Sequence, residues 1–222
     1  MKKYIVMFVC ILIIAGGCDM RIQEENRKPS EMKLDELPEA PAFKDNFTRG
    51  FLQSAEPIRE GYYPFLSESE SFTMDFPEEM KVEYRSHFAS SDNERETIEI
   101  RNVEKNRNVH VHFFMQYYRS MGTAEDSMRM MSASADKDLN FKKIETTYEN
   151  QYLDVAEFQY DENNHTILAI VWNEAGQQIQ ISLMARCLDS EEMDRCEPLT
   201  KEDREKTMEQ FKSIELILPE ND

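Results

Sequence analysis

The sequence predicts an α+β fold, in which an antiparallel sheet of about seven strands carries one internal helix and one C-terminal helix. Between residues 60 and 218, apolar and polar side chains alternate along several short segments, as they do in half-buried strands. Short polar turns join most of these segments, and two amphipathic helical segments interrupt them. Hairpin-linked strands with isolated helices favour an α+β architecture, and this length is enough for one core.

Residues 1–17 are expected to be a signal peptide. Lys2 and Lys3 precede an uncharged apolar run over residues 4–15, which is shorter than the ~20 residues that span a bilayer comfortably. The run ends in Ala-Gly-Gly directly before Cys18, and small residues at these positions suit cleavage by a signal peptidase. An ordinary secretory signal and an N-terminal membrane helix that is never cut are the alternatives.

This segment resembles bacterial lipoprotein signals as a class, although Leu is commoner in them than the Ala15 found here. The resemblance implies that Cys18 begins the mature chain and carries a diacylglycerol thioether with acyl chains such as palmitate. Two or more acyl chains hold a protein stably to a bilayer. We therefore expect Cys18 to be a lipidation site that anchors the protein on the extracytoplasmic face of the cell membrane.

The segment after Cys18 is expected to hold the folded domain away from the membrane. Residues 18–42 are polar, charged and contain three prolines, a composition that predicts a flexible tether. Residues 43–60 begin with Phe43, Phe47 and Phe51 at near-helical spacing, which predicts a short helical arm. The single α+β domain is expected over residues 61–218.

The first half of this domain is predicted to be mostly strands. In the second strand Phe72, Met74 and Phe76 alternate with polar residues, and in the fifth every second residue from Val109 to Tyr117 is apolar. The first two strands form a predicted hairpin. The candidate strands before the first helix are residues 62–66, 71–76, 81–87, 96–103 and 108–118.

The two predicted helices begin at Thr123 and Thr200, each in a pattern that resembles a capping box. In the first helix an apolar stripe is interpreted as core packing, not as a ligand or copper site, and it comprises Ala124, Met128, Met131 and Ala135. One later strand, 166–172, is apolar on both faces and is expected to be central. The other candidate strands are 142–149, 152–160, 178–184 and 213–217.

The domain resembles the PsbP-like fold over residues 60–218. The resemblance is carried by the hairpin that ends in Ser-Phe-Thr-Met-Asp-Phe-Pro77, the helix after the long middle strand, and the final helix that runs into Phe-Lys-Ser-Ile-Glu-Leu216. Glu78 and Glu79 stand where an aromatic residue often follows the proline. The resemblance implies an α/β/α sandwich whose relatives mostly bind or scaffold other proteins, and it transfers no functional residue.

The composition limits the partners of the mature chain. The full chain has 26 basic and 44 acidic residues and a net charge of −18, which becomes −20 without the two lysines of the leader. Such a charge argues against nucleic acid as a partner and against a surface that lies on anionic lipid headgroups. Solubility is the expected consequence, with a basic partner or loose divalent-cation binding as the alternative.

Cys187 and Cys196 are the two cysteines that remain after Cys10 of the leader and Cys18 are set aside. Outside the cytoplasm such a pair is expected to form a disulfide, which would stabilise the fold by about 2.7 kcal/mol for a ten-residue loop. A redox pair or a metal site is the alternative, but the spacing is not Cys-x-x-Cys and no histidine lies nearby in the sequence.

His110 and His112 are the only other candidates for a site. On a strand both imidazoles point to the face opposite Val109, so they could supply two ligands to zinc or copper. A third ligand would come from a neighbouring strand, for example Glu99 or Glu157. The alternative is a polar strand face that happens to carry two histidines.

No catalytic motif accompanies these residues. The chain lacks the serine-hydrolase, zinc-protease and phosphate-loop signatures, so no enzymatic activity and no cofactor are expected. The sequence therefore predicts a membrane-anchored extracytoplasmic lipoprotein that binds a protein partner or assists an envelope complex. The alternative is a metal- or small-ligand-binding lipoprotein that uses the His110/His112 face.

Overall fold

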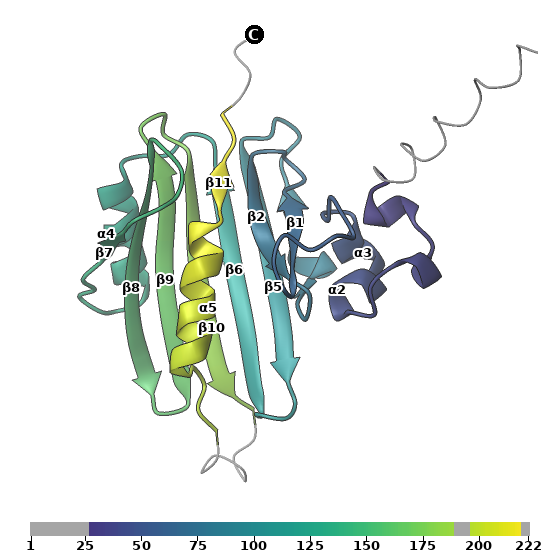
Figure 1. Ribbon diagram of the computed structural model, residues 1–222. Coiled ribbons are helices and arrows are strands. Elements are labelled where there is room, and N and C mark those ends of the chain that lie inside the picture. The colour runs from purple at the N-terminus through teal and green to yellow at the C-terminus, as the bar shows by residue number, and fades with distance from the viewer. Residues whose placement is uncertain (1–26, 189–195, 219–222) are drawn as a thin grey trace, which may run out of the picture.

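The computed structural model describes residues 27–188 and 196–218, which fold into two antiparallel sheets and a few helices (Figure 1). Within these ranges the large sheet has eight strands in the order β3-β5-β6-β10-β9-β8-β7, with β4 beside β5, and the small sheet has the order β1-β2-β11. Each of these strand pairs is antiparallel. The predicted α+β fold class is therefore confirmed.

The elements have the following bounds. The large sheet consists of β3 (Lys81–Val82), β4 (Phe88–Ala89), β5 (Arg95–Glu104), β6 (Val109–Tyr118), β7 (Lys142–Ile144), β8 (Gln151–Asp161), β9 (Asn164–Asn173) and β10 (Gln178–Cys187). The small sheet consists of β1 (Tyr62–Leu66), β2 (Phe72–Pro77) and β11 (Glu215–Leu216). The helices are η1 (Pro29–Glu31), η2 (Leu34–Glu36), α2 (Pro41–Lys44), α3 (Asn46–Arg49), η3 (Tyr84–Ser86), α4 (Ala124–Ser134) and α5 (Lys201–Lys212).

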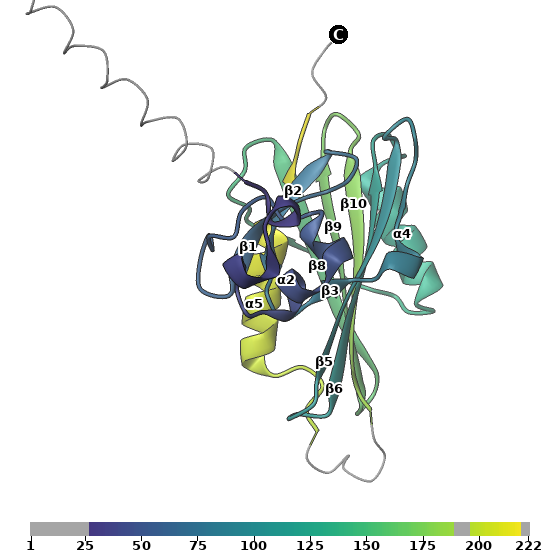
Figure 2. The ribbon, with the colours of Figure 1, turned by 90° about the vertical axis from the view of Figure 1, so that its right-hand side faces the viewer.

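The core lies between the inner face of the large sheet and a layer made of α5 and the small sheet. As predicted, alternate residues of β6 from Val109 to Tyr117 point inward, and most of them are buried. Phe72, Met74 and Phe76 of β2 meet them from the small sheet. Figure 2 shows α5 and α4 on opposite sides of the large sheet. The core found in the described ranges runs from Leu37 to Leu216.

Strand β9 is the central strand that its sequence predicts. It lies between β10 and β8, and every residue from His165 to Val171 is buried. Its inward residues belong to the core, whereas Leu168 and Ile170 point to the other face. Both faces of this strand are therefore covered, which explains why its sequence does not alternate.

The apolar stripe of α4 packs differently from the prediction. Ala124 and Ala135 are buried, but the main core contains no residue of α4. Met128 and Met131 are only half-buried, because α4 lies on the outer face of the sheet, away from the core. The interpretation of the stripe as core packing is thus wrong for its methionines.

Two predicted strands are shorter than expected. The segment 81–87 divides into β3 and η3, because Tyr84 and His87 turn away from the sheet to contact the ring of Phe47. The segment 142–149 keeps only the three residues of β7 as a strand. Beyond it the Thr146 hydroxyl donates to the Tyr148 carbonyl at 3.1 Å, which closes a local turn instead of extending the strand.

The ordered part of the chain begins before the predicted end of the tether at residue 42. Residues from Pro29 onward form η1 and η2, and Leu37 and Ala40 are buried in the core. Two apolar anchors are thus enough to fix a segment whose average composition is polar. The predicted arm at 43–60 contains only the short helices α2 and α3, with Asp45 capping α3 through the Thr48 amide at 2.8 Å.

Candidate functional site

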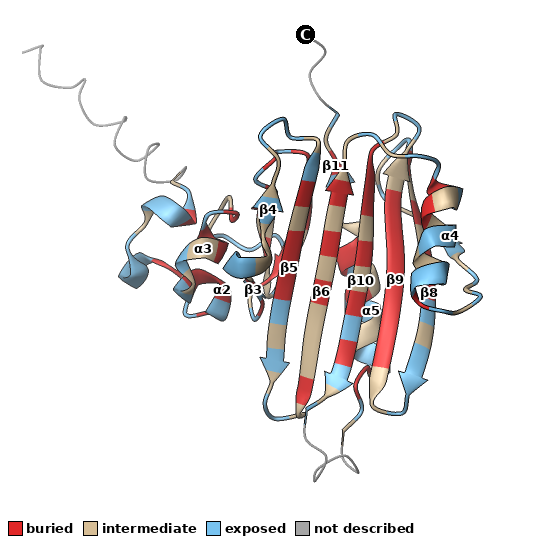
Figure 3. Cartoon of the chain, turned by 180° about the vertical axis from the view of Figure 1, so that it is seen from behind, coloured by how far each residue is buried: buried red, intermediate tan, exposed pale blue. Residues whose placement is uncertain are grey.

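The outer face of the large sheet is only partly covered. Figure 3 shows that α4 lies toward β8 at one edge, while the outer faces of β5, β6 and β10 have no helix above them. Since side chains alternate along a strand, the residues of β6 that point outward are His110, His112, Phe114, Gln116 and Tyr118. This part of the sheet is therefore open to a partner.

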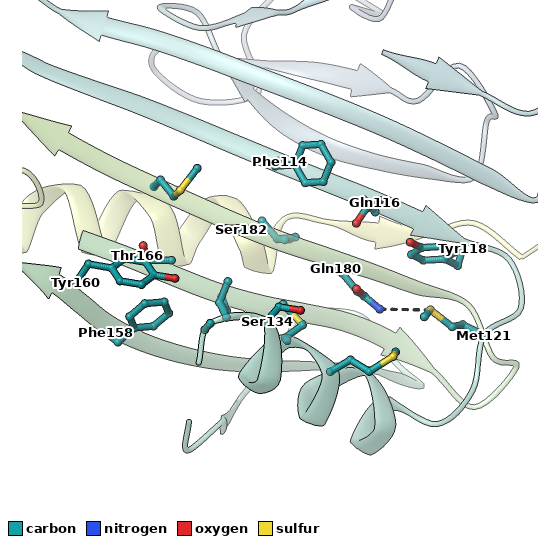
Figure 4. Close-up of a pocket in the computed structure, with 16 residues that line it drawn as sticks. Phe114, Gln116, Tyr118, Met121, Ser134, Phe158, Tyr160, Thr166, Gln180 and Ser182 are labelled. Atoms are coloured by element: carbon teal, nitrogen blue, oxygen red, sulfur yellow. Dashed lines mark hydrogen bonds between the residues drawn. The ribbon is translucent and has the colours of Figure 1, made fainter. Parts of the chain in front are cut away.

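An apolar groove runs along this face beside α4 (Figure 4). Its volume is about 390 Å³. The side chains that give it its character are four methionines, four aromatic residues and one leucine: Met121, Met130, Met131, Met184, Phe114, Tyr118, Phe158, Tyr160 and Leu168. Methionine and aromatic side chains adapt to apolar ligands of varied shape. The groove is therefore suited to an apolar group.

Hydrogen bonds from β10 hold α4 in place beside the groove. The Ser127 hydroxyl of α4 donates to Gln178 Oε1 at 2.7 Å, and Gln178 Nε2 donates to the Gly122 carbonyl at 2.5 Å. Gln180 Nε2 lies 3.3 Å from the sulfur of Met121, the contact drawn in Figure 4. The start of α4 is thus fixed to β10, while Met130 and Met131 lie further along the helix.

A second cavity of about 480 Å³ continues the groove toward the other end of β10. Tyr160, Thr166 and Met184 line both cavities, so the two adjoin. The second cavity has a different character, because two guanidinium groups and three imidazoles line it: Arg101, Arg186, His110, His112 and His165. Together the cavities form one groove with an apolar end and a basic end.

The charges of the basic end are only partly compensated. Arg101 forms ion pairs with Glu99 and, at 3.7 Å, with Glu83. Burial opposes ionisation of Glu99, but hydrogen bonds from Ser86 and Arg101 hold the pKa of this carboxyl below its usual value. Arg186 is exposed and forms no ion pair with another residue of the described ranges. One of the two guanidinium groups thus lacks a counter-charge there.

The two imidazoles lie where the sequence places them, on one face and with stacked rings whose centroids are 6.3 Å apart. Burial, followed by the neighbouring charge of Arg186, lowers the pKa of His110. Burial and the charge of Arg101 also lower the pKa of His112, although the nearby Glu99 opposes this. Both side chains therefore favour the neutral form at neutral pH.

The geometry gives no support to a metal site at these histidines. Glu99 lies 3.1 Å from His112 Nε2, as the sequence suggested, but this carboxylate is already paired with Arg101. Glu157, the other suggested ligand, binds His165 and Arg204 instead. Over residues 27–188 and 196–218, no three His, Cys, Asp or Glu side chains are placed to hold a metal ion.

The predicted disulfide is present between Cys187, the last residue of β10, and Cys196. The amide of Leu188 donates to the carbonyl of Asn108 at 3.0 Å, next to this link. The disulfide therefore joins the end of β10 to the segment that enters α5, at the basic end of the groove. The predicted lipidation site, Cys18, lies outside the described residues.

Sequence reasoning missed the groove for an identifiable reason. Alternation was used to find the core face of each strand, and Phe114 and Tyr118 on the opposite face of β6 were not treated as a surface of their own. The predicted strand 178–184 also ended before Arg186, so this residue was not placed beside the histidines. The apolar outward residues of β6 were the available signal.

In the part of the chain that the structure describes, no helix is long and apolar enough to cross a membrane.

Comparison with known proteins places the chain in a family. It is 30% identical over 150 residues to the Bacillus subtilis (strain 168) protein named "Putative lipoprotein YvcA", which covers 62% of this chain and 61% of that protein. The crystal structure of the Saccharomyces cerevisiae Ran-binding protein Mog1p is similar with a TM-score of 0.42 and 7% identity, over 70% of this chain and 95% of that one. The family model described as "Putative lipoprotein YvcA" matches residues 38–215, and the chain therefore belongs to this lipoprotein family.

Proposed function

We propose that this protein is a lipid-anchored, extracytoplasmic binding protein without catalytic activity, and that it takes its ligand on the outer face of the large sheet. The observation that carries the proposal is the groove formed by the two adjoining cavities beside α4. Small-molecule sites are typically concave, mostly apolar and of about 300–1,000 Å³, with a few polar groups that converge on the ligand. The groove agrees with these properties in its size and in the largely apolar lining of one end.

Membership of a lipoprotein family supports the anchor. The leader, its small residues and Cys18 have the order that lipid attachment requires, and acyl chains on Cys18 would keep the domain at the outer surface of the membrane. A binding protein at that place meets its ligands either in the surrounding medium or at the membrane itself.

The surroundings of the histidines support a role in binding without catalysis. A catalytic serine or cysteine nucleophile is usually activated by a general base, often histidine, within hydrogen-bond distance. Within the described residues neither imidazole is hydrogen-bonded to a hydroxyl or a thiol, and Glu99 is held by Arg101. Two guanidinium groups that line one cavity suit recognition of an anion.

Two finer expectations from the sequence remain predictions. One is a protein partner in the envelope, and the other is the specific resemblance to the PsbP-like fold. Neither enters the argument for the groove. A protein partner is one outcome of the second experiment below.

The anchor is tested by replacing its acceptor. A Cys18→Ser chain expressed in its native cells should lose lipid labelling and leave the membrane fraction, or accumulate as the uncut precursor. A processed Cys18→Ser chain that stays in the membrane fraction would contradict the lipid anchor. The control is Cys10→Ser, which changes the other leader cysteine and should leave labelling and membrane retention as they are.

The binding face is tested by amide hydrogen exchange. The exported chain from residue 18, with Cys18→Ser, is incubated separately with the lipid and the protein fractions of the cell envelope. We expect one fraction to slow exchange in α4, which borders the groove, and to leave α5 on the opposite face unchanged. If α5 is protected, or if neither fraction protects α4, the proposal is wrong.

A further inference from the structure

The groove has a basic end in a strongly acidic protein. The chain has 44 acidic against 26 basic residues. At this end, however, two arginines and three histidines line one cavity. Glu99 and Glu83 both pair with Arg101, and Glu157 pairs with His165. The Arg186 guanidinium is exposed and forms no ion pair with another described residue. An anion that enters the groove finds a guanidinium here that no carboxylate of the described residues neutralises.

The other end of the groove offers apolar contacts. Met131 and Met130 face it from α4, and Leu168 and Phe114 form part of its floor. Polar side chains also line this part, and one of them, Gln180, contacts the sulfur of Met121. Burial of an alkyl chain here would gain roughly 0.8 kcal/mol for each methylene group that leaves water.

The two ends are connected along β10. Gln180, Ser182, Met184 and Arg186 are alternate residues of this strand and share its outer face. At about 3.4 Å per residue, the distance from Gln180 to Arg186 is about 20 Å. An elongated ligand can therefore reach the guanidinium with one end while its other end lies beside the first turns of α4.

We propose that this groove binds a single-chain anionic lipid, with its carboxylate or phosphate head at Arg101 and Arg186 and its acyl chain between β10 and α4. This inference rests on the function proposed above and names the ligand class of that same site. A volume of about 390 Å³ at the apolar end suits one extended chain. The ligand is a lipid molecule removed from the bilayer, since the net charge of −18 repels an anionic membrane surface.

The inference is tested by titration calorimetry with dodecanoate and two other probes. One differs from dodecanoate in the charge of its head group, and the other lacks the alkyl chain. The exported chain from residue 18 carries Cys18→Ser, so that its own lipid cannot fill the groove, and it keeps the whole described core from Leu37 to Leu216. The probes are dodecanoate, dodecyltrimethylammonium with the same chain and the opposite charge, and acetate with the head alone. Dodecanoate should bind at one site per chain, dodecyltrimethylammonium at least about tenfold more weakly, and acetate not measurably.

Two variants separate the head from the chain. Arg186→Gln should weaken dodecanoate binding by about tenfold. The matched control Arg85→Gln removes another exposed guanidinium that forms no ion pair with a described residue and lines none of these cavities, and it should bind like the parent. Ser182→Phe places a ring on the groove floor and should weaken binding of both amphiphiles. Thermal unfolding of each variant shows whether it is folded.

Equal binding of the two amphiphiles, or dodecanoate binding that is indifferent to Arg186→Gln, would overturn the inference, since only apolar adhesion would remain. The absence of dodecanoate binding would overturn it as well. In that case, protection of α4 by the protein fraction in the exchange experiment would leave the proposed binding function intact. A failure of the lipid inference can therefore be told apart from a failure of the proposed binding function.

Discussion

Glu96 shows how a single buried charge can organise this fold. Its side chain is 1% exposed. Its carboxylate accepts hydrogen bonds from the Glu68 amide at 3.0 Å, the Ser69 amide at 2.9 Å and the Ser69 hydroxyl at 2.6 Å. His87 Nε2 lies 3.2 Å away. Glu96 thereby fixes the turn of the small sheet to the large sheet.

The charge of Glu96 should make stability depend on pH. Burial opposes its ionisation, but hydrogen bonds from His87 and Ser69 lower its pKa overall. A carboxyl whose folded pKa is lowered contributes stability above its unfolded pKa of about 4.3, and this contribution is lost as the pH falls through the folded pKa. Urea unfolding between pH 7 and pH 3 should therefore show a decline that Glu96→Gln reduces.

At pH 7 the Glu96→Gln variant should be less stable by roughly 2–3 kcal/mol, the cost of weakening hydrogen bonds to a buried charge. Glu162→Gln, an exposed change of the same kind, should leave both the free energy of unfolding and its pH dependence unaltered. Equal pH dependence in the parent and in Glu96→Gln would show that Glu96 is not the responsible group.

The histidines of the groove should make ligand binding depend on pH. His110 and His112 have lowered pKa values in the free protein, where burial and the two arginines outweigh Glu99. A bound anion favours the imidazolium, so binding takes up protons and the affinity should increase several-fold from pH 8 to pH 6. An ordinary carboxylic acid stays ionised in this range, since its pKa is roughly 4 to 5.

Titration calorimetry with dodecanoate at each pH measures this dependence. In the double variant His110→Gln, His112→Gln the affinity should change little between pH 8 and pH 6. If the affinity of the parent chain for dodecanoate stays constant or decreases from pH 8 to pH 6, the imidazoles do not help to hold the head group.

Among the elements, the strands were predictable and their fine boundaries were not. The inward alternation of β6 and the two-sided burial of β9 follow from period and composition, which a sequence displays directly. The position of β11 beside β2 does not follow from such patterns. Gln151 donates to the Ile214 carbonyl at 2.6 Å and accepts from the Leu216 amide at 2.9 Å, across more than sixty residues. Local patterns cannot reveal such a contact.

The disulfide between Cys187 and Cys196 connects two elements, because it links the end of β10 to the segment before α5. Its reduction should lower the free energy of unfolding by about 2–3 kcal/mol, chiefly because the unfolded chain gains freedom. Urea unfolding with and without a thiol reductant measures the change, and the double variant Cys187→Ser, Cys196→Ser should match the reduced parent. An unchanged midpoint on reduction would contradict a stabilising role.

At the scale of the whole molecule, the sequence predicted the α+β class but neither the position of α4 nor the groove beside it. The leader and Cys18 indicated an exported lipoprotein, and the match to a lipoprotein family agrees with them. The candidate site was only half recognised. The histidine pair was visible from its spacing, whereas the groove depends on where α4 lies and on Arg186 of a different strand, both of which follow from tertiary packing.

The position of α4 also decides what its methionines do. A helical stripe of apolar residues usually packs into the core, and the sequence alone gave no reason to expect otherwise. In the structure Met131 lines the groove, while Met74 and Met115 are buried in the core. The methionines are therefore divided between two environments, and this division provides a direct test.

If the groove on the outer face is the ligand site, a bound lipid must perturb the methionines that line it, and methionine methyl NMR measures this. The exported chain with Cys18→Ser and labelled methionine methyl groups is titrated with dodecanoate. We expect shifts for the groove methionines Met121, Met130, Met131 and Met184, and none for Met74 and Met115, which serve as internal controls. Shifts confined to other methionines, or no shifts at saturating dodecanoate, would contradict a ligand site in this groove.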